Sequence, residues 1–351
     1  MTPQRFDHKW LRHIAAQVLA FHNIGRREAE LVADSLVTAD LWGHGSHGIL
    51  RLAWYVDRLR SGAMSAKAEP EIVQDDGAVA VMDGHNGVGQ VIAARAATEA
   101  LTRARRDGAG VIGVRSSNHF GTAAYFTRMA AHAGCVGLLW TNSSPAMPPW
   151  GGRDKLVGSN PWSIAVPLGS ERVAVLDVSN TTVARGKLYR AQASGESIPE
   201  GWAVTKHGDN TTDPTQALEG MLLPMGGHKG YGMSFMVDML AGVLTGSGFG
   251  TAVNGPYQAK LAGHSGHLYI AIDITRFMPL HEFNHRASKL INEVRSSGLR
   301  SPEEPIRYPG ELEDERAAEY CRFGVPLPDE TACSLKAEVR AAGLDWAPSL
   351  L

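Results

Sequence analysis

Over residues 5–60 the apolar positions recur every three or four residues, as they do on one face of a helix. Trp10, Ile14, Val18 and Phe21 show this spacing, and alanines are frequent in the same segment. Gly25 interrupts the pattern and marks a break between helices. The pattern therefore predicts a group of amphipathic helices at the start of the chain.

From about residue 71 the apolar residues gather instead in short runs, which are typical of buried strands. The runs AVAVMDG and GVIGVRSS flank an alanine-rich helix, QVIAARAATEALTRARRDG. This βαβ order predicts a sheet that is parallel at least in part. Further expected strands are VGLLW, SIAVP, VAVLDVS and LYIAIDI. The loops between the strands are rich in Gly, Pro, Ser and Asn, and such loops carry the ligands in α/β folds.

Composition and charge narrow the class of protein. The 351 residues carry a net charge of −2 without a basic block, so neither nucleic acid nor an anionic membrane is expected as a partner. Three cysteines without a CxxC pair argue against a disulfide framework and suit a reducing compartment. The N-terminus lacks the apolar core of a signal peptide, and Asp238 interrupts the most apolar run. We expect a cytoplasmic protein.

The segment GHGSHGILR carries the first candidate chemistry. Ser46 is suited to cap a helix that continues through ILRLAWYVDRL, which would place His47, Arg51 and Tyr55 on one helix face. Arg51 offers a planar fork for a carboxylate, and His47 is suited to exchange a proton with an oxygen next to that carboxylate. The alternative is a capped surface helix with solvated polar residues.

Two glycine-containing segments supply further candidates. In VRSSNHFGTAAYF a strand ends before His119, and the helix start after Phe120 and Gly121 lets backbone N–H groups meet an anion. In GGHKGYGMSF, Lys229 and Gly230 precede an apolar helix over 232–245, where a phosphate would be stabilised. The alternatives are a capping turn with a hydrogen-bonded histidine and a glycine-rich helix start with an exposed lysine.

The segment HEFNH matches the zinc-protease pattern HExxH, with His281 and His285 as ligands and Glu282 as base. Ser288 and Ile291 replace the continuation that would supply a third histidine, so we expect no zinc. The alternative is a helix N-terminus after a proline. Neither GSGFGT nor GHNGVG follows a strand with Rossmann spacing, so no Rossmann fingerprint is predicted.

Ten segments together show a family resemblance. In chain order they are SHGILR, SSNHFGTAAYF, NSSPAMPPWGG, GSNPWSIAVP, LDVSNTTVARGK, IPEGWAV, TTDP, GGHKGYG, GHLYIAIDI and YPGE. This order, from about residue 5 to 320, resembles the malate/L-lactate dehydrogenase family of non-Rossmann NAD(P)-dependent oxidoreductases. The family includes ureidoglycolate and sulfolactate dehydrogenases, diketogulonate reductase and the piperideine/pyrroline-2-carboxylate reductases.

The resemblance implies roles for matching residues. The proton donor falls on His47, with Ser46 beside it and Arg51 contacting the substrate carboxylate, and His119 is a second candidate acid or base. Asp177 has two alternative roles, orienting His47 or contacting the cofactor. The implied cofactor contacts, including the His119 turn, are His119, Phe120, Gly121, Ser143, Asp177, Val178, Ser179, Lys229, Gly230, Pro309, Gly310 and Glu311. Members typically form homodimers.

The resemblance also implies an α/β fold with a mixed sheet and helix-rich ends. We divide the chain into a helical part, 1–70, that packs with 300–351, an α/β part from 71–118 and about 281–300, and a cofactor-binding domain, 119–280. The reading GGHKG occurs in the cyclic-imine reductases, whereas HFGTAAYF is closer to the malate and sulfolactate enzymes.

We therefore expect an enzyme that uses NAD or NADP and moves hydride to or from C2 of a small 2-oxo or 2-hydroxy acid. Alternatives are a cyclic-imine reductase, a ureidoglycolate dehydrogenase, a zinc hydrolase built on HEFNH and a catalytically silent binding protein.

Overall fold

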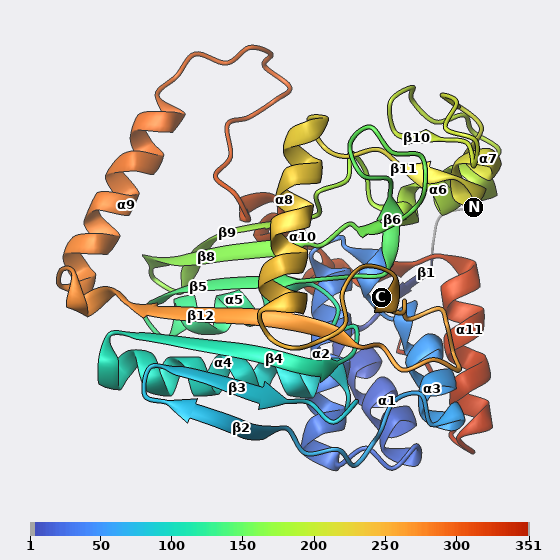
Figure 1. The fold of residues 1–351 in the computed structure, drawn as a ribbon, viewed down its shortest axis with the longest axis horizontal. Helices are drawn as coiled ribbons and strands as arrows, with labels where there is room; N and C mark the ends of the chain where they lie inside the picture. The colour runs from blue at the N-terminus through green and yellow to red at the C-terminus, as the bar shows by residue number, and fades with distance from the viewer. Residues whose placement is uncertain (1–3, 350–351) are drawn as a thin grey trace.

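The computed structural model describes residues 4–349, and a mixed β-sheet lies at its centre (Figure 1). Seven strands are hydrogen-bonded in the order β2-β3-β4-β12-β5-β8-β9. Their bounds are β2 (Glu71–Asp76), β3 (Val79–Asp83), β4 (Ala109–Ser117), β5 (Cys135–Thr141), β8 (Trp162–Gly169), β9 (Arg172–Val178) and β12 (Ser265–Asp273). The pair β3 and β4 is parallel, and the other neighbours are antiparallel. The predicted βαβ unit and the mixed α/β class are confirmed.

Helices cover both faces of this sheet (Figure 1). Helices α4 (Gly89–Asp107) and α5 (Ala123–His132) pack on one face, and α8 (His228–Asp238) with the π-helical turn Met239–Val243 lies on the other. Small side chains let α4 approach the strands closely. A Cβ at Gly110 of β4 would lie 2.0 Å from the carbonyl oxygen of Ala100, so only glycine fits there.

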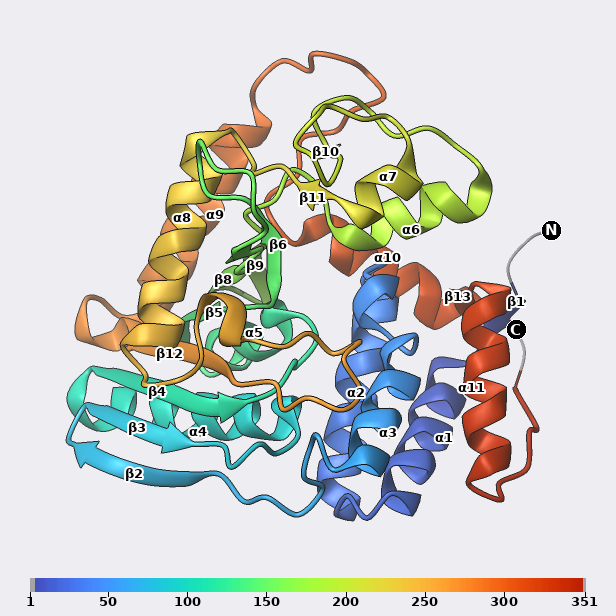
Figure 2. The same ribbon diagram turned by 45° about the vertical axis from the view of Figure 1, so that its right-hand side comes forward.

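The two ends of the chain meet beside the sheet (Figure 2). Helices α1 (His8–Phe21), α2 (Arg26–Leu41) and α3 (Arg51–Ser61) pack with α11 (Asp329–Ala341), while β1 (Gln4–Phe6) pairs with β13 (Val325–Leu327). The rings of Trp10 and Trp346 meet edge to face at 5.2 Å. Ile14 and Val18 of the predicted helix face are buried in the apolar core that these helices share, whereas Phe21 is exposed.

A smaller group of elements lies beyond β8 and β9. It comprises β6 (Pro145–Met147), β7 (Val157–Gly158), α6 (Arg185–Ser194), β10 (Ala203–Val204), α7 (Pro214–Glu219) and β11 (Met221–Leu222). It has a separate apolar cluster that includes Leu188, Ile198 and Leu222. The predicted domain boundaries remain a prediction. Strands from two of the predicted parts lie in the one central sheet.

The remaining helices are α9 (Leu280–Arg295) and α10 (Glu311–Phe323), with short 3-10 turns at Gly45–His47, Gly250–Ala252 and Ile274–Arg276. Helix α9 stands away from the body at the far end of β12 (Figure 1). Between residues 4 and 349, no helix combines the length and apolar character needed to cross a bilayer.

Candidate active site

The segment GHGSHGILR forms a tight turn between α2 and α3. The prediction of one helix that starts at Ser46 is wrong, because a 3-10 turn spans Gly45–His47 and α3 begins only at Arg51. Gly48 has φ −88° and ψ −148°, which breaks the helical path. The N–H of Ile49 is instead hydrogen-bonded to the carboxyl of Asp40 on α2. A residue nine positions upstream therefore decides where the helix starts.

Despite this break, Ser46, His47 and Arg51 stay together. The Ser46 hydroxyl lies 2.9 Å from Nδ1 of His47, and Nε of Arg51 donates to the Ser46 carbonyl at 2.6 Å. The Arg51 guanidinium stacks over the ring of Trp54 at 4.1 Å. One edge of its fork is thus held by backbone and ring, and the guanidinium is pre-organised for a planar acid group.

The turn after β4 brings His119 to the same place. The rings of His47 and His119 stack with their centroids 5.7 Å apart, and the Tyr55 hydroxyl lies 2.7 Å from Nδ1 of His119. The N–H of Gly121 also donates to this Nδ1, at 3.3 Å. A backbone N–H only donates, so Nδ1 is an acceptor and the neutral ring carries its proton on Nε2.

Burial and the local positive charge keep both histidines neutral. Burial, with the charge of Arg51, lowers the pKa of His47 to about 3. The same two causes lower the pKa of His119 well below its ordinary value. Burial raises the pKa of Tyr55 to about 12, so its hydroxyl stays protonated and donates to His119. A negatively charged ligand beside Arg51 would raise the pKa of both rings.

Two residues that the sequence analysis missed support the His119 turn. The buried Arg58 donates to the side-chain oxygen of Asn118 at 2.7 Å and to the carbonyl of Gln258 at 2.9 Å. Asn118 in turn donates to the carbonyl of Gly87 at 2.8 Å. The sequence signal for Arg58 was its position, because it lies seven residues after Arg51 on a helix face that is otherwise mostly apolar. Phe120, by contrast, is buried, and its ring meets that of His267 at 4.7 Å.

The predicted cofactor residues form two groups. In the first, the backbone N–H of Ser143 donates to the side chain of Asn160 at 2.9 Å, and Asn160 donates to the carbonyl of Ser234 on α8. Gly230 packs against this network, since an added Cβ would meet the Asn180 carbonyl oxygen at 2.7 Å. Ser179 immediately precedes Asn180 in the chain. Lys229 lies next to Gly230 in the first turn of α8, where its side chain is exposed.

The second group lines the end of β9. A cavity of about 220 Å³ is bordered by Trp42, His44, Asp177, Gly310 and Glu313, among others. Asp177 accepts the N–H of Ala124 at the start of α5, and burial raises its pKa. The neighbouring charges are those of His44 and Glu313, whose side chains lie 3.5 Å apart.

The PGE segment is held against the same strand. The Pro309 carbonyl accepts the N–H of Val175 at 2.9 Å, and Gly310 has φ +93°, a conformation that favours glycine. Glu311 pairs with Arg295. Val178, between the two groups, pairs with Trp162 in the sheet. The end of β9 therefore connects both groups of predicted cofactor residues.

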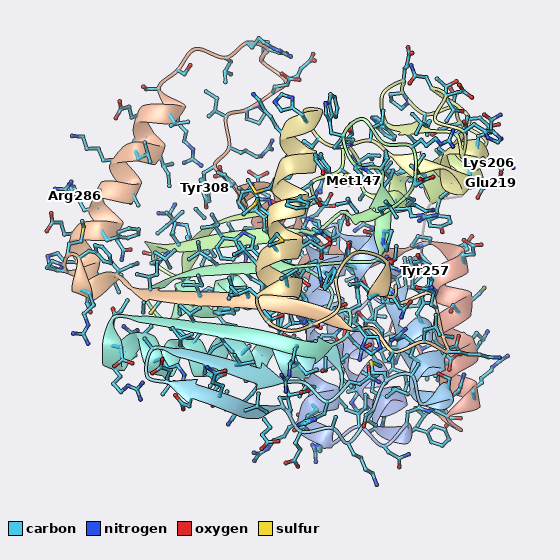
Figure 3. The ribbon with its side chains drawn as sticks, in the orientation of Figure 1. Met147, Lys206, Glu219, Tyr257, Arg286 and Tyr308 are labelled. Carbon is cyan, nitrogen blue, oxygen red and sulfur yellow. The ribbon has the colours of Figure 1, made fainter. Side chains whose placement is uncertain are left out.

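The donor set around these groups fits a phosphate-bearing dinucleotide. It offers a lysine at a helix N-terminus, serine hydroxyls, and glycines that allow a close approach. The HEFNH segment lies elsewhere: Glu282 pairs with Arg286 on α9, and no three potential metal ligands cluster within residues 4–349. In Figure 3, Arg286 lies at the opposite end of the molecule from Tyr257, whose ring packs on Trp54 beside Arg51.

Comparison with known proteins agrees with this geometry. The family profile for malate/L-lactate dehydrogenase matches residues 6–336. The chain is 39% identical to the L-sulfolactate dehydrogenase of Methanothermobacter thermautotrophicus, over 90% of this chain and 91% of that protein. Its fold superposes on the sulfolactate dehydrogenase of Methanocaldococcus jannaschii with a TM-score of 0.91 and 35% identity, covering 97% and 98% of the two chains.

Two further relatives carry a cofactor in their names. The chain is 31% identical to the ureidoglycolate dehydrogenase (NAD(+)) of Escherichia coli O157:H7, over 93% of each protein. It is 37% identical to the (2R)-3-sulfolactate dehydrogenase (NADP(+)) of Chromohalobacter salexigens, over 75% of this chain and 79% of that protein. The chain therefore belongs to the malate/L-lactate dehydrogenase family, and it is an NAD(P)-dependent oxidoreductase that acts on small hydroxy acids.

Proposed function

We propose that the substrate is a 2-oxo or 2-hydroxy acid of the malate or sulfolactate type, bound by Arg51 and proton-coupled to His47. The meeting of His47, Arg51 and His119 at one place carries this proposal, because a carboxylate clamp and two imidazoles surround the same point. The names of the relatives favour a substrate with a second acidic group.

His47 and His119 have different roles in the proposed reaction. When the 2-hydroxy acid is oxidised, the neutral His47 ring accepts the hydroxyl proton while the C2–H bond breaks and its electron pair leaves as hydride. In the reverse direction His47 returns this proton to the oxygen. His119 has its Nδ1 occupied by two donors, so we assign Nε2–H as a hydrogen-bond donor to the same substrate oxygen. Ser46 orients His47, and Tyr55 orients His119.

Arg51 binds the carboxylate next to C2 and thereby orients the reacting carbon. This anion also offsets the positive charge that contributes to the low pKa of His47. His47 therefore becomes a better base once substrate is bound. Asp177 is assigned to cofactor binding rather than to His47, in view of its contacts with α5 and its proximity to His44.

Bound NAD(P) supplies or accepts the hydride. We propose that Lys229, Gly230 and Ser143 hold its phosphates, and that the end of β9 and the PGE segment hold the rest. Ser179 and Val178 join the two groups. Phe120 and Gly121 act through the backbone of the His119 turn.

A homodimer is proposed from one apolar face of α8 and its π-helical extension. Met236, Met239, Val243 and Leu244 recur at helical spacing, and each is at least 40% exposed. A second copy of the chain would bury this strip. Light scattering on wild-type protein and on Leu244→Asp tests the proposal, and a wild-type monomer would overturn it. The expected cytoplasmic location is kept as a proposal.

The substrate class is tested with a panel of acids. Oxaloacetate, a 3-sulfonated 2-oxo acid, pyruvate and a cyclic imine acid are each offered with NADH and with NADPH, and oxidation of the cofactor is followed by absorbance. We expect the highest kcat/KM with one of the two dianionic 2-oxo acids. Turnover of the cyclic imine alone would instead identify a cyclic-imine reductase. Ureidoglycolate is offered separately with NAD+ and with NADP+, and turnover of this compound alone would identify a ureidoglycolate dehydrogenase.

A further inference from the structure

A buried carboxyl lies directly beneath the turn that carries His47. Asp40, near the end of α2, is only 5% exposed. Its Oδ2 accepts the N–H of Ile49 at 2.8 Å. Its own backbone carbonyl accepts the N–H of Gly43 at 2.9 Å. Asp40 therefore contacts both ends of the turn, although it belongs to a different element.

The turn is shaped around this carboxyl group. A Cβ at Gly48 would lie 1.9 Å from one carboxyl oxygen of Asp40 and 2.3 Å from the other. The φ of Gly48 is −88°, which residues other than glycine also adopt. Gly45, at the start of the same turn, faces the carboxyl as well, at 3.6 Å from its would-be Cβ. The glycine at 48 is thus required by Asp40 and not by a left-handed backbone.

Keeping a carboxyl in this place is unfavourable for stability. Among residues 4–349 no Lys, Arg or His side chain forms an ion pair with Asp40. Burial raises the pKa of Asp40 to about 7, which reflects the free-energy cost of its charge. An apolar residue of similar size would avoid that cost. A group kept at a cost to stability beside reacting residues is expected to serve the reaction.

We propose that Asp40 is a positioning residue, whose carboxyl fixes the turn from Gly45 to Ile49 and thereby sets the His47 ring for proton transfer. Asp40 does not contact the substrate. The proposal rests on the proposed function, in which His47 exchanges the substrate proton. It predicts that loss of the Asp40 anchor slows turnover far more than it weakens cofactor binding, because the proposed phosphate-binding residues Ser143, Lys229 and Gly230 belong to other elements.

The test compares Asp40→Ala with Asp40→Asn in the full-length enzyme. Asp40→Ala removes the acceptor for Ile49, so we expect kcat to fall about 10- to 100-fold through misplacement of His47. The Kd for NAD(P)H should stay within about twofold, because Ser143, Lys229 and Gly230, which are proposed to hold the phosphates, lie on other elements and are unchanged. Asp40→Asn keeps an acceptor oxygen and should recover most of the lost kcat. A purely stabilising residue would not give this split between kcat and Kd.

Asp273 provides a matched control. It is 3% exposed, it accepts the N–H of Thr275 at 3.0 Å, and it ends β12, the middle strand of the sheet, at the end of that strand away from the site. Asp273→Ala should lower the melting temperature and leave the kcat of the folded enzyme unchanged. If Asp40→Ala behaves in the same way, the proposal is overturned.

A second variant keeps the proposal testable if Asp40→Ala does not fold. In Gly48→Ala the new methyl group collides with the carboxyl of Asp40, so either the carboxyl leaves its place beneath the turn or the turn shifts, and in both cases kcat should fall. Unchanged kcat in folded Gly48→Ala would contradict the proposal. Wild-type enzyme without activity on any acid of the panel would refute the proposed function instead, so the two failures can be distinguished.

Discussion

The hydrogen bond from Tyr55 to His119 allows a quantitative prediction. In Tyr55→Phe, Nδ1 of His119 loses the donor at 2.7 Å and keeps only the weaker contact with Gly121 N–H at 3.3 Å. Tyr55 is 1% exposed, so water does not readily replace the lost hydroxyl. Leaving a buried acceptor without this donor costs about 1–3 kcal/mol. If this free energy raises the transition state and not the enzyme–substrate complex, kcat falls about 5- to 150-fold.

The assay is steady-state turnover of the best acid from the panel, with the melting temperature measured in parallel. Tyr269→Phe is the matched control, because Tyr269 is fully buried and its hydroxyl donates to the Phe126 carbonyl at 2.8 Å. Both variants should lose stability, and only Tyr55→Phe should lose kcat. Equal kcat in the two variants would refute the idea that Tyr55 orients His119.

Lys229→Ala should weaken NAD(P)H binding by about 10- to 150-fold in a fluorescence titration, since it removes a charge-assisted contact of about 1.5–3 kcal/mol. Lys206→Ala, another exposed lysine, should have no effect, and equal affinities would make Lys229 a surface residue. Arg51→Lys should chiefly raise KM, because the single charge cannot bind a carboxylate with two parallel hydrogen bonds; an unchanged KM would contradict the clamp. The lowered pKa values of His47 and His119 mean that at these residues the unfolded chain takes up protons first, so the two histidines lower the free energy of unfolding as the pH drops from about 6.5 toward about 3, whereas the raised pKa of Asp40 acts in the opposite direction. Chemical denaturation of wild type and of His47→Ala at several pH values isolates the contribution of His47, and parallel profiles would argue against a buried neutral histidine.

Local patterns predicted the elements better than the site. The βαβ unit was predictable because the periodicities of β3, α4 and β4 arise from neighbours in the sequence. The start of α3 was not, because Gly48 and a carboxyl from α2 determine it. His47, Arg51 and Tyr55 nevertheless lie at one site as expected, since Arg51 holds the Ser46 carbonyl and Tyr55 reaches His119, whose ring stacks on His47.

Contacts distant in sequence explain what could not be predicted. The bond between Tyr55 and His119 joins residues 64 positions apart, and that between Arg58 and Asn118 joins residues 60 positions apart. No periodicity reports such pairs. For the same reason the sequence left two roles open for Asp177, whose position at the start of α5 depends on the pairing of β9 with β8.

The role of His47 as the proton-exchanging residue is tested most directly by the pH dependence of kcat in His47→Ala and His119→Ala. Cofactor affinity is measured for both variants, so that only enzymes with an intact cofactor site are compared. We predict that His47→Ala lowers kcat by about 10²- to 10⁴-fold and abolishes the ionisation that controls the wild-type profile. His119→Ala should lower kcat but keep that ionisation. Loss of the ionisation in His119→Ala, with near-normal kcat in His47→Ala, would contradict the account and make His119 the acid.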